Sequence, residues 1–317
     1  MEKTVLIVDR NAEWYAQQLR PRFAGCAFVA AKDASAGVQE AAAAKAQVLV
    51  GLAPYLSAEL IGAMPRLDWI HALTSGVDNL LAMPEISAHV AISASRGIHG
   101  PQMSELAILL MLSLQRRFPE MLANQRAQTW HRWPQPLLAG KTVCLVGIGS
   151  IAEVLVERCR AFGMNVTGVS AGRRDVPGFT KVYDRANICA AAAEADFLVV
   201  IAPYSAATHH LVDDAVLEAM RPHAFLINIA RGGCVDEAAL VRHLRAGSIA
   251  GAGLDVFDTE PLPAAHPLWS APNVIVTPHI GGMSDTYAAQ ALPVLERNLA
   301  AYLAVGAVAL PDRVTRA

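Results

Sequence analysis

The 317-residue chain lacks the features that mark several other classes of protein. Its five cysteines contain no close pair, so their spacing indicates neither a disulfide framework nor a zinc site, and we predict no metal. A net charge of −2 provides no basic field for a polyanion, which argues against nucleic-acid binding. The longest uncharged apolar stretch near the C-terminus, 299–310, is shorter than the roughly 20 residues that span a bilayer, so no membrane partner is expected.

The beginning of the chain lacks a secretion signal, because Asp9 comes too soon after Met1 for the apolar core of a signal peptide. We therefore expect a cytoplasmic protein whose scattered cysteines are buried as small apolar side chains. The chain is 54% hydrophobic and only 17% charged, a composition that suits a large buried parallel sheet. Its length exceeds the usual limit of a single core, so two domains are expected.

Apolar strand candidates alternate with helical stretches in both halves of the chain, which is the pattern of βαβ units. The candidates in the first half are 5–8, 27–30, 48–50, 69–72 and 90–92. The candidates in the second half are 142–146, 165–169, 197–201, 224–228, 252–255 and 274–276. The second set predicts a six-stranded parallel sheet with right-handed crossovers. The Ala41–Ala44 run is expected to be ordinary helix.

The pattern breaks at 95–101, where Gly100 and Pro101 precede a strong helix predicted over 104–117. This helix is apolar nearly all round, so we expect it to be buried between domains or subunits. A polar stretch with tryptophans, 125–135, is expected to form a loop over the cleft. The last helix, from about 284 to 305, is expected to return to the first domain.

These boundaries predict an α/β protein of two doubly wound parallel-sheet domains. Residues 99–283 form one of these domains, which is inserted in the other, formed by residues 1–98 and 284–317. Ligands in such sheets bind outside the carboxyl ends of the strands, so polar residues just after a strand are the candidate site residues.

The segment Gly147-Ile148-Gly149-Ser150-Ile151-Ala152 matches the dinucleotide fingerprint, with Ala152 in place of the third glycine. A strand precedes it, a helix follows it, and another strand begins at the expected distance. Gly147 permits the tight turn, and Gly149 lets the backbone approach a pyrophosphate at the helix N-terminus, where Ser150 and Ile151 begin the helix. The alternative is a glycine-rich turn without a ligand.

The second strand of this domain ends in Ser170, where an acid normally binds the adenosine ribose, and Arg173 and Arg174 follow. A hydroxyl and two guanidinium groups favour a 2′-phosphate, so we predict NADP as the cofactor, with NAD possible. The alternative is a pair of solvated charges, one of them neutralised by Asp175.

Three chemically informative residues, Arg231, Glu260 and His279, each follow a short apolar run. At one sheet edge, a cation can bind an anionic substrate, and an imidazole beside a carboxylate can act as an acid–base catalyst. Hydride delivery to a 2-keto acid leaves an alkoxide, which must gain a proton from an acid such as imidazolium. The substrate's carboxylate and carbonyl suit a bidentate arginine.

The segments around these residues, together with the upstream fingerprint, resemble the D-isomer-specific 2-hydroxyacid dehydrogenase family. The segments are Ala230-Arg231-Gly232, Asp255-Val256-Phe257 with Glu260-Pro261, and Thr277-Pro278-His279. The similarity is densest over 140–282 and includes 74–78. The resemblance implies that Arg231 holds the substrate, that His279 is the acid–base and that Glu260 orients His279.

The same resemblance implies that backbone amides around Ser75 and Gly76 grip the substrate carboxylate. It also places Asp255 close to the nicotinamide amide. The remaining cofactor-lining positions that it implies are Ala202, Pro203, Thr208, Ala230, His279 and Gly281.

We therefore predict that residues 99–283 are a Rossmann dinucleotide-binding domain, inserted in a flavodoxin-like substrate domain of residues 1–98 and 284–317. We also predict an NADPH-preferring reductase that converts small 2-keto acids of the glyoxylate, hydroxypyruvate or pyruvate type to D-2-hydroxy acids, as a homodimer. Two alternatives stay open: an NAD-dependent D-2-hydroxyacid dehydrogenase that works oxidatively, and a non-catalytic scaffold that senses dinucleotides. The sequence also leaves the roles of Arg96 and His99 open, since both stand at the domain junction.

Overall fold

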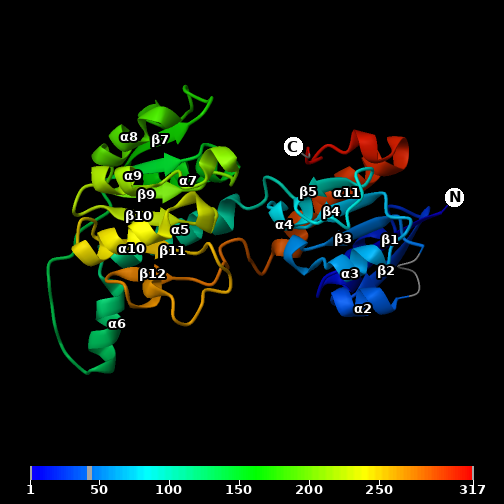
Figure 1. Ribbon diagram of the computed structural model, residues 1–317, viewed down its shortest axis with the longest axis horizontal. Coiled ribbons are helices and arrows are strands. Elements are labelled where there is room, and N and C mark those ends of the chain that lie inside the picture. The colour runs from blue at the N-terminus through cyan, green and yellow to red at the C-terminus, as the bar shows by residue number, and fades with distance from the viewer. Residues whose placement is uncertain (1, 41–44, 316–317) are drawn as a thin grey trace. The chain divides into compact units, whose positions relative to one another are not determined.

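The computed structural model describes residues 2–40 and 45–315, and the predicted helix at Ala41–Ala44 lies outside the described residues. The chain folds into two compact units (Figure 1). We call residues 1–98 with 284–317 the terminal unit, and residues 99–283 the central unit. Each contains one wholly parallel sheet with helices on both faces, so the predicted α/β fold class is confirmed.

The terminal unit has a five-stranded sheet in the order β2-β1-β3-β4-β5, which is the flavodoxin-like order. Its strands are β1 Lys3–Val8, β2 Cys26–Ala31, β3 Val48–Gly51, β4 Trp69–Ala72 and β5 Ala91–Ala94. Its helices are α1 Ala12–Leu19, α2 Ala34–Gln39, α3 Ala58–Gly62, α4 Asp78–Leu81 and α11 Tyr287–Val305. Apolar side chains of α1 and α11 cover one face of the sheet, and those of α3 cover the other. The last helix therefore does return to the first domain.

The central unit has a seven-stranded sheet in the order β8-β7-β6-β9-β10-β11-β12. Its strands are β6 Thr142–Val146, β7 Asn165–Ser170, β8 Lys181–Asp184, β9 Phe197–Val200, β10 Phe225–Asn228, β11 Gly251–Leu254 and β12 Val274–Val276. The prediction of six strands was wrong by one. The missed strand, β8, is a four-residue edge strand in which Lys181 and Asp184 flank only two less polar residues, so it carries no apolar run.

The helices of the central unit are α5 Gly100–Gln115, α6 Phe118–Arg126, α7 Ser150–Ala161, α8 Ile188–Glu194, α9 Asp214–Ala219 and α10 Glu237–Ala246. Apolar residues of α5 and α7 pack on one face of the sheet, and those of α8, α9 and α10 pack on the other. The contact of α5 with α7 is close, because a Cβ on Gly100 would lie 2.7 Å from Val154 Cγ2. The apolar side chains of α5 thus fill the core of the central unit. From the sequence we expect this helix to be buried between domains or subunits, and that expectation does not include a place in the core of one unit.

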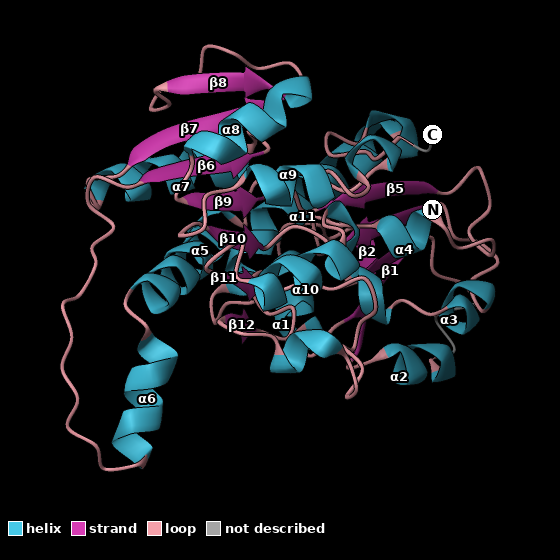
Figure 2. Cartoon of the chain, turned by 60° about the vertical axis from the view of Figure 1, so that its left-hand side comes forward, coloured by secondary structure: helices cyan, strands magenta, loops and turns pink. Residues whose placement is uncertain are grey.

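Residues 118–135 form an arm that extends from the central unit, with α6 and the following irregular segment set away from the sheet (Figure 2). The expected loop at 125–135 is therefore partly helix, since α6 ends at Arg126. No residue of α6 is buried, and Trp130 is 90% exposed. The apolar side chains of the arm therefore pack little against the rest of the chain.

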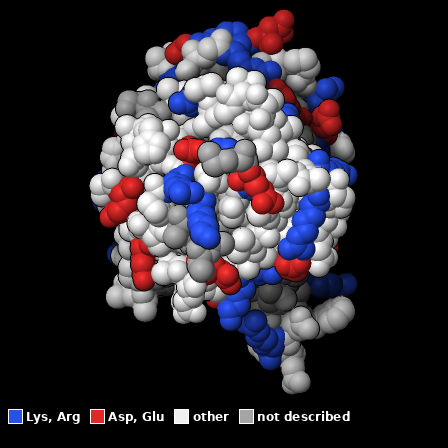
Figure 3. Space-filling model, turned by 90° about the vertical axis from the view of Figure 1, so that its right-hand side faces the viewer, with Lys and Arg blue, Asp and Glu red and all other residues white. Residues whose placement is uncertain are grey.

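The surface carries charges of both signs. On the face drawn in Figure 3, basic and acidic side chains are interspersed among uncharged ones. Among the described helices, none combines the length and the apolar character needed to cross a bilayer. All five cysteines are free, and all are buried except Cys189, which is exposed.

Candidate active site in the central unit

The strand order of the central sheet reverses between β6 and β9, and this is where a crevice opens at the carboxyl ends of the strands. Gly147 follows β6 with a φ of +102°, and a Cβ there would lie 2.7 Å from both the N and Cα of Ala202. Only glycine fits this turn. A cavity of about 280 Å³ adjoins it. Its lining residues are Val146, Gly147, Ile148, Val169, Ser170, Ala171, Gly172, Arg173, Arg185, Ala202, Pro203 and Leu211.

The N-terminus of α7 borders this crevice. Gly149 is the N-cap residue of α7, and a Cβ on it would meet nothing within 4 Å, so a ligand can approach the backbone there. Ser150 and Ile151 form the first turn, where backbone N–H groups have no intrahelical acceptor. Ala152 is fully buried against the sheet, which explains why a small residue replaces the third glycine. These residues fit a dinucleotide pyrophosphate.

The loop after β9 contributes two residues to the cavity wall. Ala202 and Pro203 line it, whereas Thr208 is buried and makes its hydrogen bonds within the loop. The Thr208 hydroxyl donates to the Pro203 carbonyl oxygen at 2.8 Å and accepts from the Ser205 N–H at 2.7 Å. Thr208 therefore fixes the shape of the loop, and its own contact with a cofactor stays a prediction.

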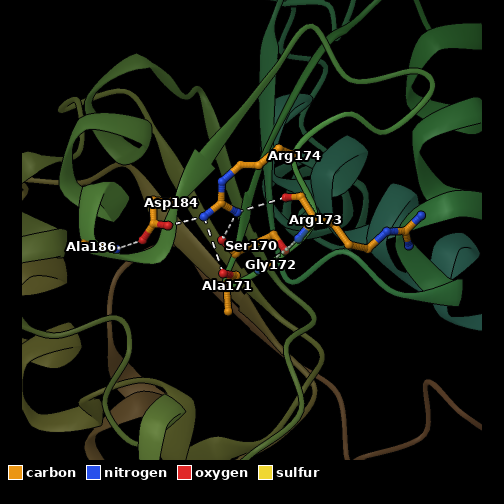
Figure 4. A network of polar contacts seen from close by, with 7 residues as sticks. All are labelled: Ser170, Ala171, Gly172, Arg173, Arg174, Asp184 and Ala186. Carbon is orange, nitrogen blue, oxygen red and sulfur yellow. Dashed lines mark hydrogen bonds and ion pairs between the residues drawn. The ribbon is translucent and has the colours of Figure 1, made fainter.

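The loop after β7 holds the two neighbouring arginines in different environments (Figure 4). Ser170 Oγ accepts hydrogen bonds from the backbone N–H groups of Gly172 and Arg173, at 3.3 and 3.0 Å. Arg173 Nη1 donates to Glu153 Oε1 at 2.6 Å, and Arg174 pairs with Asp184. The acids that neutralise these cations are therefore Glu153 and Asp184, and not the adjacent Asp175.

Three further site residues follow three neighbouring strands. Arg231 follows β10, Glu260 follows β11 and His279 follows β12, and the three strands are parallel neighbours. His279 Nδ1 lies 2.6 Å from Glu260 Oε2. The two side chains are 44% and 34% exposed, so the pair is accessible from solvent. With Nδ1 bound to the carboxylate, Nε2 is the ring nitrogen through which a proton can reach a substrate.

The second carboxylate oxygen of Glu260 is also bound, since Oε1 accepts the Phe257 N–H at 2.9 Å. Burial by itself would raise the pKa of Glu260. The hydrogen bonds from His279 and Phe257 and the positive charges of His279 and Arg231 outweigh burial, so the pKa is lowered below its usual value. Glu260 is thereby kept ionised as the partner of the imidazole.

Arg231 is half-buried on a loop that its neighbours hold in place. Asn228 at the end of β10 donates from Nδ2 to the Arg231 carbonyl oxygen at 2.9 Å, and its Oδ1 accepts the Ala230 N–H at 3.1 Å. The positive charge of Arg231 acts on Glu260 and also on His99. A cation thus stands within electrostatic reach of the acid–base pair.

Asp255 is buried beneath the loop that carries His279. Its Oδ1 accepts from the Thr277 hydroxyl at 2.6 Å and from the Ile280 N–H at 3.0 Å, and its Oδ2 accepts from the Gly281 N–H at 2.9 Å. These bonds hold His279 at a φ of +51°. The geometry gives Asp255 a positioning role, and its predicted contact with the nicotinamide amide stays a prediction.

The remaining candidates lie in two places. Ser75 and Gly76 belong to the terminal unit, in the bend after β4, where Thr74 Oγ1 donates to the Gly76 carbonyl oxygen at 2.8 Å. Arg96 is exposed in the same unit. His99 is the N-cap residue of α5 in the central unit, and burial, with a smaller contribution from Arg231, lowers its pKa to about 4. His99 is therefore neutral at physiological pH.

Sequence reasoning missed four residues of these surroundings: Glu153, Asp184, Arg185 and Asn228. Arg185 lines the cavity from the turn after β8. Asn228 had a usable signal, since it is a polar residue at the end of an apolar strand. Asp184 and Arg185 had none, because β8 was not predicted.

Comparison with known proteins finds a matching family model and similar sequences. The family model described as "D-isomer specific 2-hydroxyacid dehydrogenase, NAD binding domain" matches residues 108–281. A glyoxylate reductase of Thermococcus onnurineus is 33% identical over 263 residues, which cover 79% of this chain and 78% of that protein.

Two solved structures extend the similarity to the whole chain. A D-isomer specific 2-hydroxyacid dehydrogenase family protein of Aeromonas salmonicida has a TM-score of 0.91 at 30% identity, with 100% of each chain covered. An NADPH-dependent glyoxylate/hydroxypyruvate reductase of Sinorhizobium meliloti, in complex with NADP and malonate, has a TM-score of 0.79 at 28% identity. That match covers 100% of this chain and 98% of the other.

Proposed function

This chain belongs to the D-isomer-specific 2-hydroxyacid dehydrogenase family, and on that premise we propose that it reduces small 2-keto acids to D-2-hydroxy acids with a preference for NADPH. It is an NAD(P)-dependent oxidoreductase. The observation that carries the proposal is the 2.6 Å contact between His279 Nδ1 and Glu260 Oε2, at the sheet edge that also bears Arg231. Glyoxylate, hydroxypyruvate and pyruvate are the substrates that we infer.

In this proposal, Arg231 binds the planar carboxylate and carbonyl of the substrate through its guanidinium fork. When bound, the nicotinamide cofactor would supply the hydride for the carbonyl carbon. His279 donates a proton from Nε2 to the carbonyl oxygen, and Glu260 stabilises the imidazolium before that transfer. That backbone amides around Ser75 and Gly76 also bind the carboxylate stays a prediction.

The cofactor is held by residues of the central unit. Gly147, Gly149, Ser150 and Ile151 would bind the pyrophosphate at the N-terminus of α7. The positions that would line the rest of the dinucleotide are Ala202, Pro203, Thr208, Ala230, Asp255, His279 and Gly281. The hydroxyl of Ser170 and the cations of the following loop support the preference for a 2′-phosphate.

The arm supports a homodimer. Its helix α6 buries no residue within the chain, and Trp130 is 90% exposed. Large exposed aromatic side chains are typical of interface anchors. A second copy that covers the arm would bury them. A cytoplasmic location stays a prediction.

The proposed activity is tested by measuring oxidation of NADPH and NADH by the full-length protein with a panel of 2-keto acids. We expect turnover of glyoxylate or hydroxypyruvate, faster with NADPH. Reduction of none of the panel, with cofactor binding intact, would favour the dinucleotide-sensing scaffold. Efficient oxidation of D-2-hydroxy acids with NAD, and poor reduction, would favour the oxidative dehydrogenase.

A further inference from the structure

We propose that Arg173 and Arg185 are the two cations that meet the 2′-phosphate of NADP, and that Arg174 instead fastens the loop to the sheet. This inference rests on the proposed use of NADPH. Two adjacent arginines thus have different roles, and a third arginine comes from the turn after β8.

The guanidinium of Arg174 is already bound on several sides (Figure 4). It pairs with the carboxylate of Asp184 at the end of β8. Its Nη1 also donates to the carbonyl oxygens of Ser170 and Arg173, at 2.7 and 3.0 Å. The planar guanidinium of Arg174 thus connects two carbonyl groups of the loop to the next strand, β8, and this fixes the loop against the sheet. Arg174 does not line the cavity.

Arg173 and Arg185 both line the cavity, and each follows the carboxyl end of one of the neighbouring parallel strands β7 and β8. Arg173 follows β7, and its side chain points away from that of Arg174 in Figure 4. Its bond to Glu153 joins two side chains that are 47% and 51% exposed. Exposed ion pairs are weak, so a phosphate can replace this carboxylate at little cost.

Arg185 is half-buried in the turn after β8. Its Nη1 donates to the Ala207 carbonyl oxygen at 3.3 Å, and no acid of the described residues lies within ion-pair distance of it. A guanidinium held by one long hydrogen bond to a neutral oxygen keeps donors for an anionic ligand. It faces the same cavity as Ser170.

Ser170 supplies the third contact. Its Oγ accepts two backbone N–H groups, which occupies both lone pairs. The hydroxyl hydrogen is then its remaining hydrogen-bonding capacity, and a hydrogen can only be donated to an acceptor such as a phosphate oxygen. The cavity wall therefore offers one hydroxyl donor and two guanidinium groups to a 2′-phosphate.

The test compares R173Q, R174Q and R185Q in the full-length protein, with R245Q as the matched control on the exposed end of α10. The dissociation constants of NADPH, NADH and adenosine 2′,5′-bisphosphate are measured by calorimetry without any 2-keto acid. We expect R173Q and R185Q each to weaken NADPH and the bisphosphate by about 10-fold or more and to leave NADH unchanged. R174Q should weaken NADPH and NADH by the same factor, because it loosens the loop.

A double-mutant cycle checks the fastening role. D184N should reproduce R174Q, and the double variant should be no worse than either single one, because both remove the same pair. The inference is overturned if R185Q behaves as R245Q does, if R174Q selectively weakens NADPH, or if the wild type binds NADH as tightly as NADPH. If R173Q and R185Q bind NADPH more weakly and NADH unchanged, while the wild type reduces none of the 2-keto acids, the roles of the arginines are supported and only the proposed activity is contradicted.

Discussion

Gly232 lies directly against the backbone of Phe257, so close that a Cβ on Gly232 would come within 1.9 Å of the Phe257 carbonyl carbon. The two residues belong to the loops that carry Arg231 and Glu260. The contact therefore fixes the distance between the proposed substrate clamp and the partner of the proposed acid–base. A change at Gly232 must move one loop relative to the other.

Gly232→Ala should consequently lower kcat/KM by about 100-fold, because a displacement of about 1 Å in catalytic groups costs this much. NADPH binding should stay near that of the wild type. Gly62→Ala is the control, since a Cβ at Gly62 meets nothing within 4 Å. Wild-type kinetics in Gly232→Ala would show that the two loops do not need this contact.

His279→Gln should lower kcat by roughly 10²–10⁴-fold with cofactor binding intact, because the amide cannot transfer a proton. Stopped-flow turnover and calorimetric titration with NADPH measure the two quantities. His89→Gln, at an exposed position of the terminal unit, serves as the control. A folded His279→Gln enzyme with full activity would contradict the mechanism.

Glu260→Gln should change the pH dependence of reduction. The lowered pKa of Glu260 keeps its carboxylate ionised, so reduction by the wild type should slow on the acid side only as pH falls through that pKa. The amide of the variant does not titrate and stabilises the imidazolium less, so reduction should be slower overall and should lack this acidic limb. At low pH, part of the activity should survive. An unmoved pH–rate profile would leave Glu260 only the role of bonding the Phe257 N–H.

Arg231→Lys should lose most of kcat/KM, because an ammonium group cannot reproduce the planar fork. The loss should appear with every 2-keto acid of the panel, since all share the carboxylate. Unchanged KM and kcat in this variant would assign substrate binding to another group.

The meeting of Arg231, Glu260 and His279 could be predicted because each follows an apolar run and parallel strands end at one edge. The Rossmann turn was predictable for the same reason, since Gly147 stands between a strand and an amphipathic helix. Each of these positions can be read from the order of apolar runs, glycines and polar residues along a short stretch of sequence.

The partners of the loop arginines could not be predicted. Glu153 lies 20 residues before Arg173, and Asp184 lies 10 residues after Arg174, on elements that only the sheet topology brings near. Charge pairs of this kind leave no periodicity in the sequence. The same holds for the contact of Gly232 with Phe257, which depends on how two loops pack.

The terminal unit contains a buried histidine whose protonation should be visible in stability. His71 is completely buried, with Nδ1 2.7 Å from Ser93 Oγ and Nε2 3.2 Å from Ser95 Oγ. Burial lowers its pKa from 6.5 to about 3, and the charges of Asp312 and Arg297 contribute less and in opposite directions. The folded protein therefore keeps His71 neutral where the unfolded chain protonates it.

Because the folded pKa of His71 is depressed, its contribution to the free energy of unfolding is full above pH 6.5 and is lost as pH falls toward about 3. One such proton changes this free energy by at most about 1.4 kcal/mol per pH unit. His71→Gln should therefore flatten the decline of stability between pH 6 and pH 4 by about this slope, whatever its effect at pH 7. Urea unfolding at a series of pH values measures it, with His89→Gln as the control. Equal slopes for His71→Gln and the wild type would mean that His71 takes up its proton in the folded state as readily as in the unfolded chain.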